Sequence, residues 1–152
     1  MLVKFASPLK RMLRTLYLDA GLSEEEAHER IEGSLKEAAD PILLNATPRH
    51  AMQTLGTEWG RACIGEDIWV HLWSHRIGKL LAEGHNVVCD DCRFANEAEA
   101  VRALGGKVVR ITGRGGTEGD HPSEAGGVKA DFRIKNIRGL ADLQDAIRSF
   151  FA

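Results

Sequence analysis

The sequence predicts an α/β protein in which a parallel sheet is flanked by helices. In residues 7–82, apolar side chains recur at the spacing of amphipathic helices, whereas short β-branched runs alternate with helical segments from residue 86 onward. Strands that alternate with helices usually pair in parallel. Because the chain has 152 residues, 43% hydrophobic and 28% charged, we expect one domain over residues 1–152, with a helical region at about 7–83.

The first two helices are predicted by their capping residues. After a short apolar run, Ser7 can cap a helix with Pro8 in its first turn. Gly21 predicts where this helix ends. A capping box at Ser23 opens a second, mostly polar helix that is expected to reach about Ala39.

Two further helices follow. Thr47 and Pro48 repeat the cap-and-proline signal, although Gly56 and Gly60 interrupt the helix that they open. Each glycine lowers helix propensity by about 1 kcal/mol, which is tolerable where another group must approach the backbone closely. The fourth helix is expected over residues 67–82.

In the C-terminal part of the chain, the spacing of the apolar residues changes from the helical pattern to short β-branched runs. Short β-branched runs bounded by polar residues are typical of buried parallel strands. The expected elements, in order, are a strand at 86–90, a helix at 95–104, a strand at 107–112, a strand at 130–135 and a closing amphipathic helix at 140–151.

Charge and cysteine content limit the partners. With 20 Lys and Arg against 22 Asp and Glu, the net charge is −2, so we expect no nucleic-acid polymer as partner, and a phosphate ligand needs a local site. Three cysteines without a secretory signal favour a reducing, cytoplasmic setting. Since no apolar run approaches about 20 residues, we expect no membrane partner.

Three clusters of polar residues could form a binding or catalytic site. Arg49, Gln53, Thr57 and Arg61 recur every four residues and predict one polar stripe, suited to a phosphate and a base or simply a solvated helix face. The second group, 90–97, follows the strand at 86–90, where ligands of open α/β sheets bind; it is equally explained as a helix cap.

The third group lies in and after a glycine-rich segment. Arg114 could fold over a nucleotide, with His121 and Glu124 holding the loop closed, or the segment is a connector without a ligand. The sequence also contains possible ligands for a zinc ion. The four zinc-type side chains are His71, His75, Cys89 and Cys92, but their order is not that of a usual zinc finger.

Taken in order, these segments resemble the deoxynucleoside monophosphate kinases of tailed phages. The resemblance runs nearly the whole length of the chain and implies a three-layer P-loop kinase fold, a parallel sheet between two layers of helices. The matching stretches are residues 5–10, 49–61, 65–70, 91–97, 121–124 and 131–143.

The resemblance also implies roles for individual residues. Arg49, Arg61 and Arg93 look like the groups that hold the monophosphate, with Gln53 and Thr57 nearer the base or sugar. Asp91 looks like the magnesium-associated carboxylate and, with Arg93 and the lid arginine Arg114, forms the implied catalytic set. The other implied substrate-binding residues are Lys10, Glu58, Asn96, Glu97, His121, Ser123 and Glu124.

One motif of such kinases is not found. The sequence contains no Gly-x-x-x-x-Gly-Lys, and residues 1–5 resemble the family's second strand, so the first strand and the phosphate loop are expected to be missing. ATP is therefore not an expected cofactor, and Mg²⁺ is expected only with kinase activity. We also expect the strands at 86–90 and 107–112 to pair directly, or another chain to fill the gap between them.

Three functions remain open at this level. The first is a protein that binds a (deoxy)nucleoside monophosphate without a self-contained ATP site, in the host cytoplasm if phage-encoded. The second is an active nucleotide kinase whose phosphate loop comes from a partner or an upstream segment. The third is a protein-interaction module with a free sheet edge near Phe5, as part of a homo-oligomer or with a partner chain.

Overall fold

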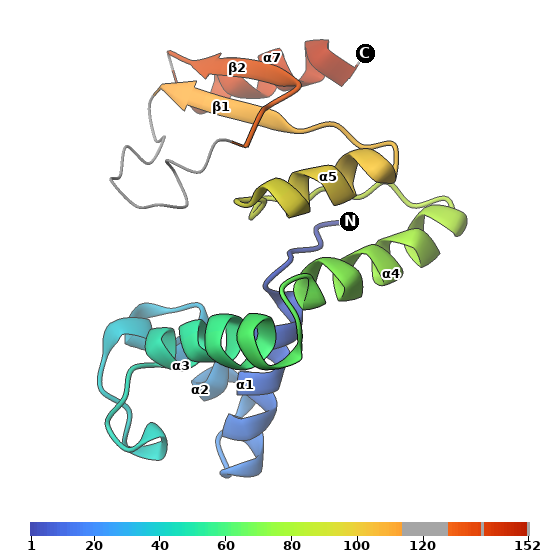
Figure 1. Ribbon diagram of the computed structural model, residues 1–152. Coiled ribbons are helices and arrows are strands. Elements are labelled where there is room, and N and C mark those ends of the chain that lie inside the picture. The colour runs from blue at the N-terminus through green and yellow to red at the C-terminus, as the bar shows by residue number, and fades with distance from the viewer. Residues whose placement is uncertain (114–127, 138, 152) are drawn as a thin grey trace. The chain divides into compact units, whose positions relative to one another are not determined.

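The computed structural model describes residues 1–113, 128–137 and 139–151, and divides into two compact units, Met1–Asp91 and Cys92–Ala152. Each unit is described by itself. The first contains the helices α1 (Ser7–Asp19), α2 (Glu24–Ile31), α3 (Pro48–Thr54) and α4 (Ile68–Ala82), the 3₁₀ turns η1 (Ser34–Glu37) and η2 (Pro41–Leu43), and the π-helix η3 (Leu55–Ile64) (Figure 1). The second contains α5 (Ala95–Ala103), β1 (Val109–Gly113), β2 (Phe132–Asn136) and α7 (Leu140–Phe151).

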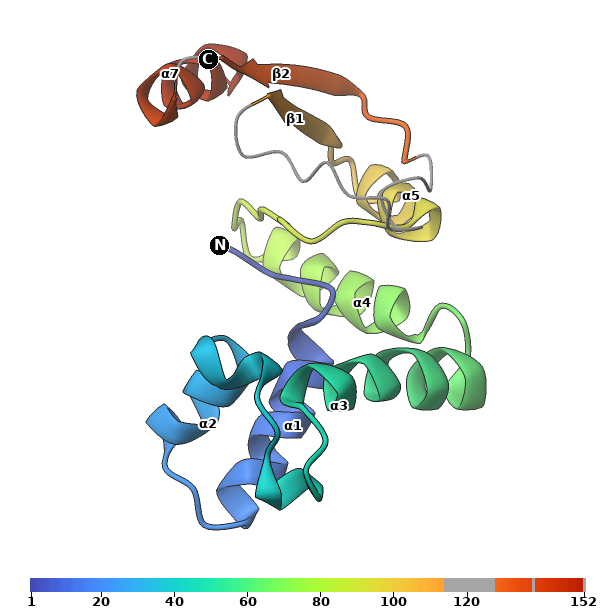
Figure 2. The same cartoon turned by 90° about the vertical axis from the view of Figure 1, so that its left-hand side faces the viewer.

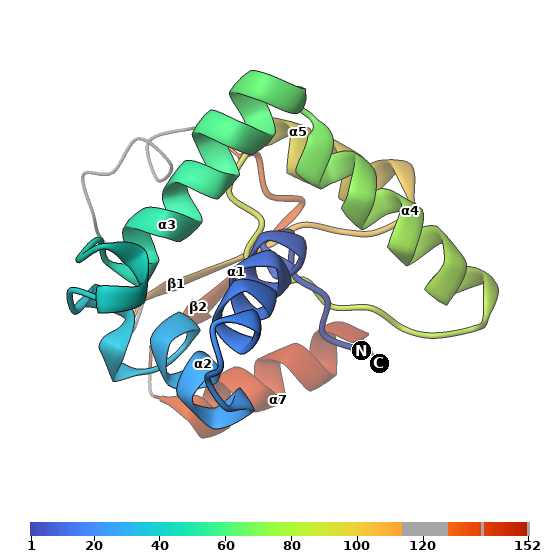
Figure 3. The same ribbon diagram turned by 90° about the horizontal axis from the view of Figure 1, so that it is seen from below.

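The core of the first unit lies between α1, α2 and α3, which pack against one another (Figure 3). Its buried side chains come from apolar positions at helical spacing. They are Leu13, Tyr17, Ala27, Ile31 and Met52. Helix α4 lies beside the N-terminal segment (Figure 2). The Phe5 ring stacks on Trp73 at 4.3 Å, and the Trp73 indole donates to the Val3 carbonyl at 3.0 Å.

The N-terminal segment runs parallel to the chain around Val88. Val3 N donates to Val88 O at 2.9 Å, and Val88 N donates to Met1 O at 2.8 Å. These bonds form a single parallel bridge between Leu2 and Val88, so the strand predicted at 86–90 is wrong in extent. Because the two segments are parallel, their carboxyl ends lie at the same edge.

The helix starts follow the capping signals in two cases out of three. At Ser23 the capping box is formed, with Glu26 N donating to the serine hydroxyl at 3.2 Å, and the Thr47 hydroxyl accepts a bond from His50 N at 3.1 Å. The Ser7 cap is wrong: Ala6 is the capping residue of α1, and its side chain makes no cap hydrogen bond.

The second helix ends earlier than predicted. It stops at Ile31 instead of about Ala39, and the chain turns into η1. The Glu29 carboxylate accepts bonds from Ser34 N at 2.7 Å and from the Ser34 hydroxyl at 2.6 Å. This local side-chain contact competes with continuation of the helix.

The predicted third helix is α-helical up to Thr54 and becomes a π-helix at Leu55. The Trp69 indole lies against Gly60, where an added Cβ would be 2.4 Å from the ring, and its Nε1 donates to Gly56 O at 2.8 Å. A π-helical turn contains more residues than an α-helical turn and is frequent at functional sites. Gly60 therefore lets an indole ring reach the backbone, which is the kind of close approach that makes a glycine in a helix tolerable.

The second unit contains a two-stranded parallel sheet. Strands β1 and β2 pair with Ile111 opposite Ile134, and α7 packs against β2 (Figure 1). The chain is thus mostly helical and α/β in a loose sense. The expected pairing of residues 86–90 with 107–112 joins the two units and stays a prediction, as does the single-domain assignment. Among the described residues, no helix is long and apolar enough to cross a membrane.

Candidate functional site

In the first unit, charged side chains gather where two parallel segments end, the N-terminal segment and the segment around Val88. The Asp91 carboxylate accepts bonds from Phe5 N at 2.9 Å and Ala6 N at 3.0 Å. Next to it, Lys4 and Asp90 form an ion pair at 3.2 Å, and the hydrogen bond to Asp90 raises the pKa of Lys4. Asp91, expected to associate with magnesium, thus fixes the start of α1 against the Val88 segment.

The neighbouring thiol is held in its protonated form. Cys89 Sγ lies 3.1 Å from Asp91 Oδ1, the geometry of a thiol donating to a carboxylate. Burial raises the pKa of Cys89 to about 12. Because the thiolate is the form that attacks electrophiles and binds metals, Cys89 is a packing and hydrogen-bonding residue at neutral pH.

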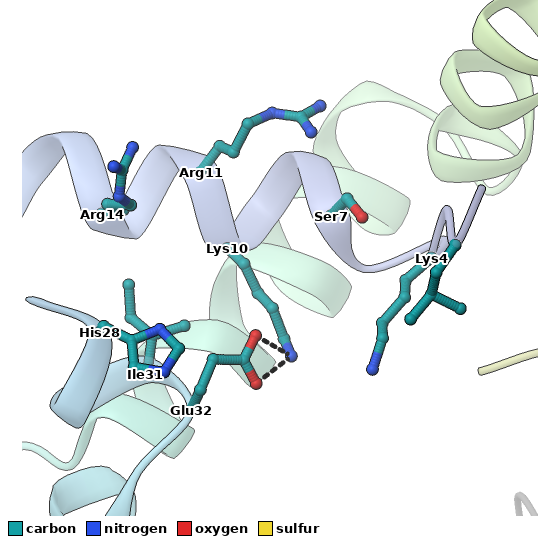
Figure 4. Close-up of a pocket in the computed structure, with 9 residues that line it drawn as sticks. Lys4, Ser7, Lys10, Arg11, Arg14, His28, Ile31 and Glu32 are labelled. Atoms are coloured by element: carbon teal, nitrogen blue, oxygen red, sulfur yellow. Dashed lines mark hydrogen bonds and ion pairs between the residues drawn. The ribbon is translucent and has the colours of Figure 1, made fainter. Parts of the chain in front are cut away.

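A cavity of about 300 Å³ opens beside the first turns of α1 (Figure 4). Within it, the Lys10 ammonium lies 2.7 and 2.8 Å from the two Glu32 oxygens. In the close-up, Lys4 and Lys10 lie on the same side of α1 as Glu32, whereas Arg11 points away from the Lys10–Glu32 pair. The residues that line the cavity are Leu2, Lys4, Ser7, Lys10, Arg11, Arg14, His28, Ile31 and Glu32.

Lys10 belongs to a larger group of charges that includes Arg49. The half-buried Lys36 connects them: burial lowers its pKa, as do the charges of Lys10 and Arg49, whereas Glu32 and Glu37 raise it. Arg49 Nε pairs with Glu37. We call Lys10, Lys36 and Arg49, with Glu32 and Glu37, the cationic cluster. It carries three positive and two negative charges.

The cationic cluster contains two predicted residues and one that sequence reasoning missed. Lys10 and Arg49 were implied as substrate-binding groups, and the structure brings both within electrostatic reach of Lys36. Lys36 was not singled out because it was placed in a continuous polar helix, where a lysine is ordinary. Because α2 ends early, Lys36 lies in η1, which packs against α2 and α3.

The predicted polar stripe is divided between two kinds of helix. Arg49 and Gln53 lie on α3, whereas Thr57 and Arg61 lie on η3. Gln53 and Thr57 are exposed, as is Glu58 on η3, and the Arg61 guanidinium donates to the Glu66 carbonyl at 3.1 Å. The two arginines therefore make contacts at opposite ends of the α3–η3 run.

In the second unit, Glu97 closes the start of α5. Only 4% exposed, it accepts bonds from Arg93 N at 2.7 Å and Phe94 N at 3.1 Å. Asn96 Oδ1 accepts a bond from Glu97 N at 3.0 Å. This arrangement is the helix cap that was one of the two interpretations of residues 90–97, and it leaves the Arg93 side chain exposed.

Four predicted site residues lie outside the described residues: Arg114, His121, Ser123 and Glu124. In the part of the chain that the structure describes, no three His, Cys, Asp or Glu side chains come together to hold a metal ion. The zinc hypothesis for His71, His75, Cys89 and Cys92 therefore has no assembled site there.

Comparison with known proteins identifies the family. The sequence profile of the family described as deoxynucleotide monophosphate kinase matches residues 4–147. The chain belongs to this family. The resemblance drawn from residues 5–10, 49–61 and 91–97 is thereby confirmed.

Two relatives support the assignment. A protein of Acanthamoeba polyphaga mimivirus, named as a candidate deoxynucleotide monophosphate kinase, is 33% identical over 132 residues, which are 79% of this chain and 65% of the relative. The deoxynucleoside-5'-monophosphate kinase of Escherichia phage T5 is 34% identical over 88 residues, 53% of this chain and 34% of the relative. The chain thus spans less than two thirds of either relative. No solved structure matches the chain.

Proposed function

We propose that this chain binds a deoxynucleoside monophosphate, with the phosphate in the cationic cluster. Membership of the deoxynucleotide monophosphate kinase family supports the class of ligand. The observation that carries the proposal is that η1, which contains Lys36, packs against α3, and that the charges of Lys10 and Arg49 both act on Lys36. Elements that are separate in sequence thus place two further cations within electrostatic range of Lys36.

The ion pairs of the cluster suit exchange with a phosphate. Glu32 and Glu37 neutralise Lys10 and Arg49, and both carboxylates are exposed, so each can move into water. A phosphate dianion gives the three cations more acceptor oxygens than the carboxylates do, and Arg recognises phosphate with two parallel hydrogen bonds. A bound phosphate would stabilise the ammonium group of Lys36 most, because Lys36 is half-buried beside two like charges.

The remaining predicted residues extend this proposal. Gln53, Thr57 and Glu58 are proposed to face the base or sugar, with Arg61 and Arg93 as further phosphate ligands. Asn96, Glu97, His121, Ser123 and Glu124 complete the proposed substrate contacts. We further propose that both units are parts of a three-layer P-loop kinase fold.

Magnesium has no prepared cage among the described residues. Asp91 provides one carboxylate, whose oxygens already accept bonds from two backbone amides and the Cys89 thiol. Asp90 pairs with Lys4.

The second candidate function is phosphoryl transfer from ATP to the bound monophosphate. Both relatives are named as kinases, which favours this candidate. An oxygen of the monophosphate would attack the γ-phosphorus, and ADP would leave. Arg93 and Arg114 are proposed to stabilise the charge of the transferred group, with the phosphate loop supplied by a partner or by a segment outside these 152 residues.

Isothermal titration with the deoxynucleoside monophosphates tests the leading proposal. We expect Lys36→Ala and Arg49→Ala each to weaken binding about tenfold or more, since each removes a charge-assisted phosphate contact. Lys79→Ala, which removes an exposed cation from α4, is the control and should bind as the parent chain does. Equal affinities in all four proteins would overturn the assignment of the cluster.

A separate titration with ATP and magnesium distinguishes the functions. Binding of the monophosphate without ATP supports the acceptor-site protein. Binding of both, with formation of deoxynucleoside diphosphate, supports the kinase. If neither nucleotide binds, the interaction-module hypothesis takes precedence.

A further inference from the structure

Helix α4 of the first unit carries two histidines that are one helical turn apart. His71 and His75 are separated by four residues, so their Cβ atoms lie about 5–6 Å from each other on one face of the helix. Side chains at this spacing also lean in the same direction along the helix axis. The two imidazole rings can therefore reach one common point beside the helix.

The histidine face of α4 is opposite the face that packs on the first unit. Trp69, Trp73 and Ile77 are the buried residues of α4 and define its inner face. In an α-helix of 3.6 residues per turn, His71 and His75 lie roughly 160° from Trp73, one on each side. Their outward position thus follows from contacts inside the first unit. It also agrees with the proposed three-layer fold, in which a helix turns this face away from the sheet.

Both imidazoles are available as ligands. His71 and His75 are exposed, and among the described residues no hydrogen bond or ion pair engages either ring. Neutral imidazole is a common metal ligand and binds through either ring nitrogen.

The spacing of the two histidines fits chelation of a single ion. Helices that bind zinc use two histidines at positions i and i+4 of one face. Once the first imidazole has bound, the second meets the ion at a high effective concentration. Imidazole suits Zn²⁺, Cu²⁺ and Ni²⁺, whereas Mg²⁺ prefers carboxylate, carbonyl and water oxygens. The ligand class is therefore a transition metal rather than magnesium.

We propose that His71 and His75 chelate one divalent transition-metal ion, with water completing the coordination sphere. In the part of the chain that the structure describes, no group of three His, Cys, Asp or Glu side chains assembles, so the site is open. Among these ions, Cu²⁺ should bind most tightly. The inference is independent of the monophosphate site, because α4 contributes no residue to the cationic cluster.

Isothermal titration with nickel chloride at about pH 7.5 tests the site, on protein without an affinity tag. Every protein carries Cys63→Ser, because the exposed thiol of Cys63 is a competing ligand. His71→Gln and His75→Gln each remove one proposed ligand. The control is His50→Gln, which removes an exposed imidazole of α3 that has no histidine one turn away. Circular dichroism checks that all variants are folded.

A second control keeps the number of histidines on α4. The double substitution His75→Gln, Lys79→His places the two imidazoles eight residues apart, about 12 Å along the helix axis, which is too far for one ion. This spacing variant also lacks the positive charge of Lys79. Electrostatics alone would therefore favour metal binding in the spacing variant.

We expect one ion per chain in the Cys63→Ser protein. The affinity should be about tenfold or more weaker in His71→Gln, in His75→Gln and in the spacing variant, and unchanged in His50→Gln. Ni²⁺ should also raise the unfolding temperature of the Cys63→Ser protein more than that of these three variants, since an ion that binds only the folded chain stabilises it.

Four results would overturn the proposal. The first is the absence of saturable Ni²⁺ binding. The second is an equal loss of affinity in His50→Gln and in the α4 variants, which would mean that each imidazole binds alone. The third is a spacing variant that binds as tightly as the Cys63→Ser protein. The fourth is one ion per two chains, which would assign the ligands to an interface between two copies.

Discussion

Asp40 is the buried acidic residue that joins three parts of the first unit. Its side chain is 4% exposed and accepts bonds from the Tyr17 hydroxyl at 2.8 Å, Arg30 Nε at 3.1 Å and Ile42 N at 3.0 Å. Burial and the bond to Asp40 raise the pKa of Tyr17 above its usual 10.0. A buried carboxylate is tolerated here because several donors satisfy it.

Replacing Asp40 should therefore destabilise the protein strongly. Asp40→Ala leaves the Tyr17 hydroxyl and the Arg30 guanidinium without their acceptor, and we expect the free energy of unfolding to fall by about 3 kcal/mol. Tyr17→Phe removes one donor and should lower it by about 1 kcal/mol. Urea denaturation measures both. Equal losses in the two variants would show that the hydrogen bonds to Asp40 contribute little beyond the bond to Tyr17.

The thiols provide a second test at single residues. Because burial raises the pKa of Cys89 to about 12, its thiolate is scarce at pH 8, whereas Cys63 is exposed. We expect Cys63 to react with a disulfide reagent in the folded protein and Cys89 to react only after unfolding. Mass spectrometry of labelled peptides identifies which cysteine is modified. Rapid labelling of Cys89 without denaturant would contradict its placement beside Asp91.

At the scale of elements, the π-helix η3 depends on close approach between two helices. We expect Gly60→Ala to lower the free energy of unfolding by about 2 kcal/mol, because the new methyl group would lie 2.4 Å from the rigid Trp69 ring. Gly56→Ala is the matched control, since the nearest atom to its methyl group, Leu9 Cδ2, is 3.6 Å away. It should be neutral or stabilising by about 0.5–1 kcal/mol, as alanine favours helices. Thermal or urea denaturation compares the two.

The helices and strands that the sequence predicts well are those marked by local patterns of residues. The capping box at Ser23 and the cap at Thr47 mark helix starts because their hydrogen bonds reach only three residues along the chain. The cap of α1 was misassigned to Ser7 instead of Ala6. Phe5 N and Ala6 N donate to Asp91, which is 86 and 85 residues away in sequence and cannot be recognised from a local pattern. The π-helical winding likewise depends on Trp69, on another helix.

The same difference between local signals and long-range contacts explains which residues of the candidate site could be predicted from the sequence. The resemblance supplied Lys10 and Arg49, and the family assignment is confirmed over residues 4–147, while the site roles of both residues remain proposals. Lys36 was missed because its position depends on where α2 ends.

Stability toward acid tests whether both units depend on hydrogen-bonded carboxylates. The Ser34 hydroxyl and amide lower the pKa of Glu29 below its usual 4.5, and Val108 N with Arg102 lowers that of Asp131 below 3.8. The folded protein therefore binds fewer protons than the unfolded chain in this range. The stabilisation is complete above about pH 5 and is lost as the pH falls through the lowered values of the folded state.

We therefore expect the free energy of unfolding to decrease from about pH 5 to pH 3, as measured by urea denaturation at a series of pH values. Glu29→Gln and Asp131→Asn should each reduce the slope, because each removes a carboxylate that takes up a proton on unfolding. Glu25→Gln, an exposed residue of α2, controls for the loss of one negative charge and should keep the parent slope. A slope that is the same in all variants would mean that other groups govern acid unfolding. A reduced slope only in Glu29→Gln would assign the acid sensitivity to the first unit.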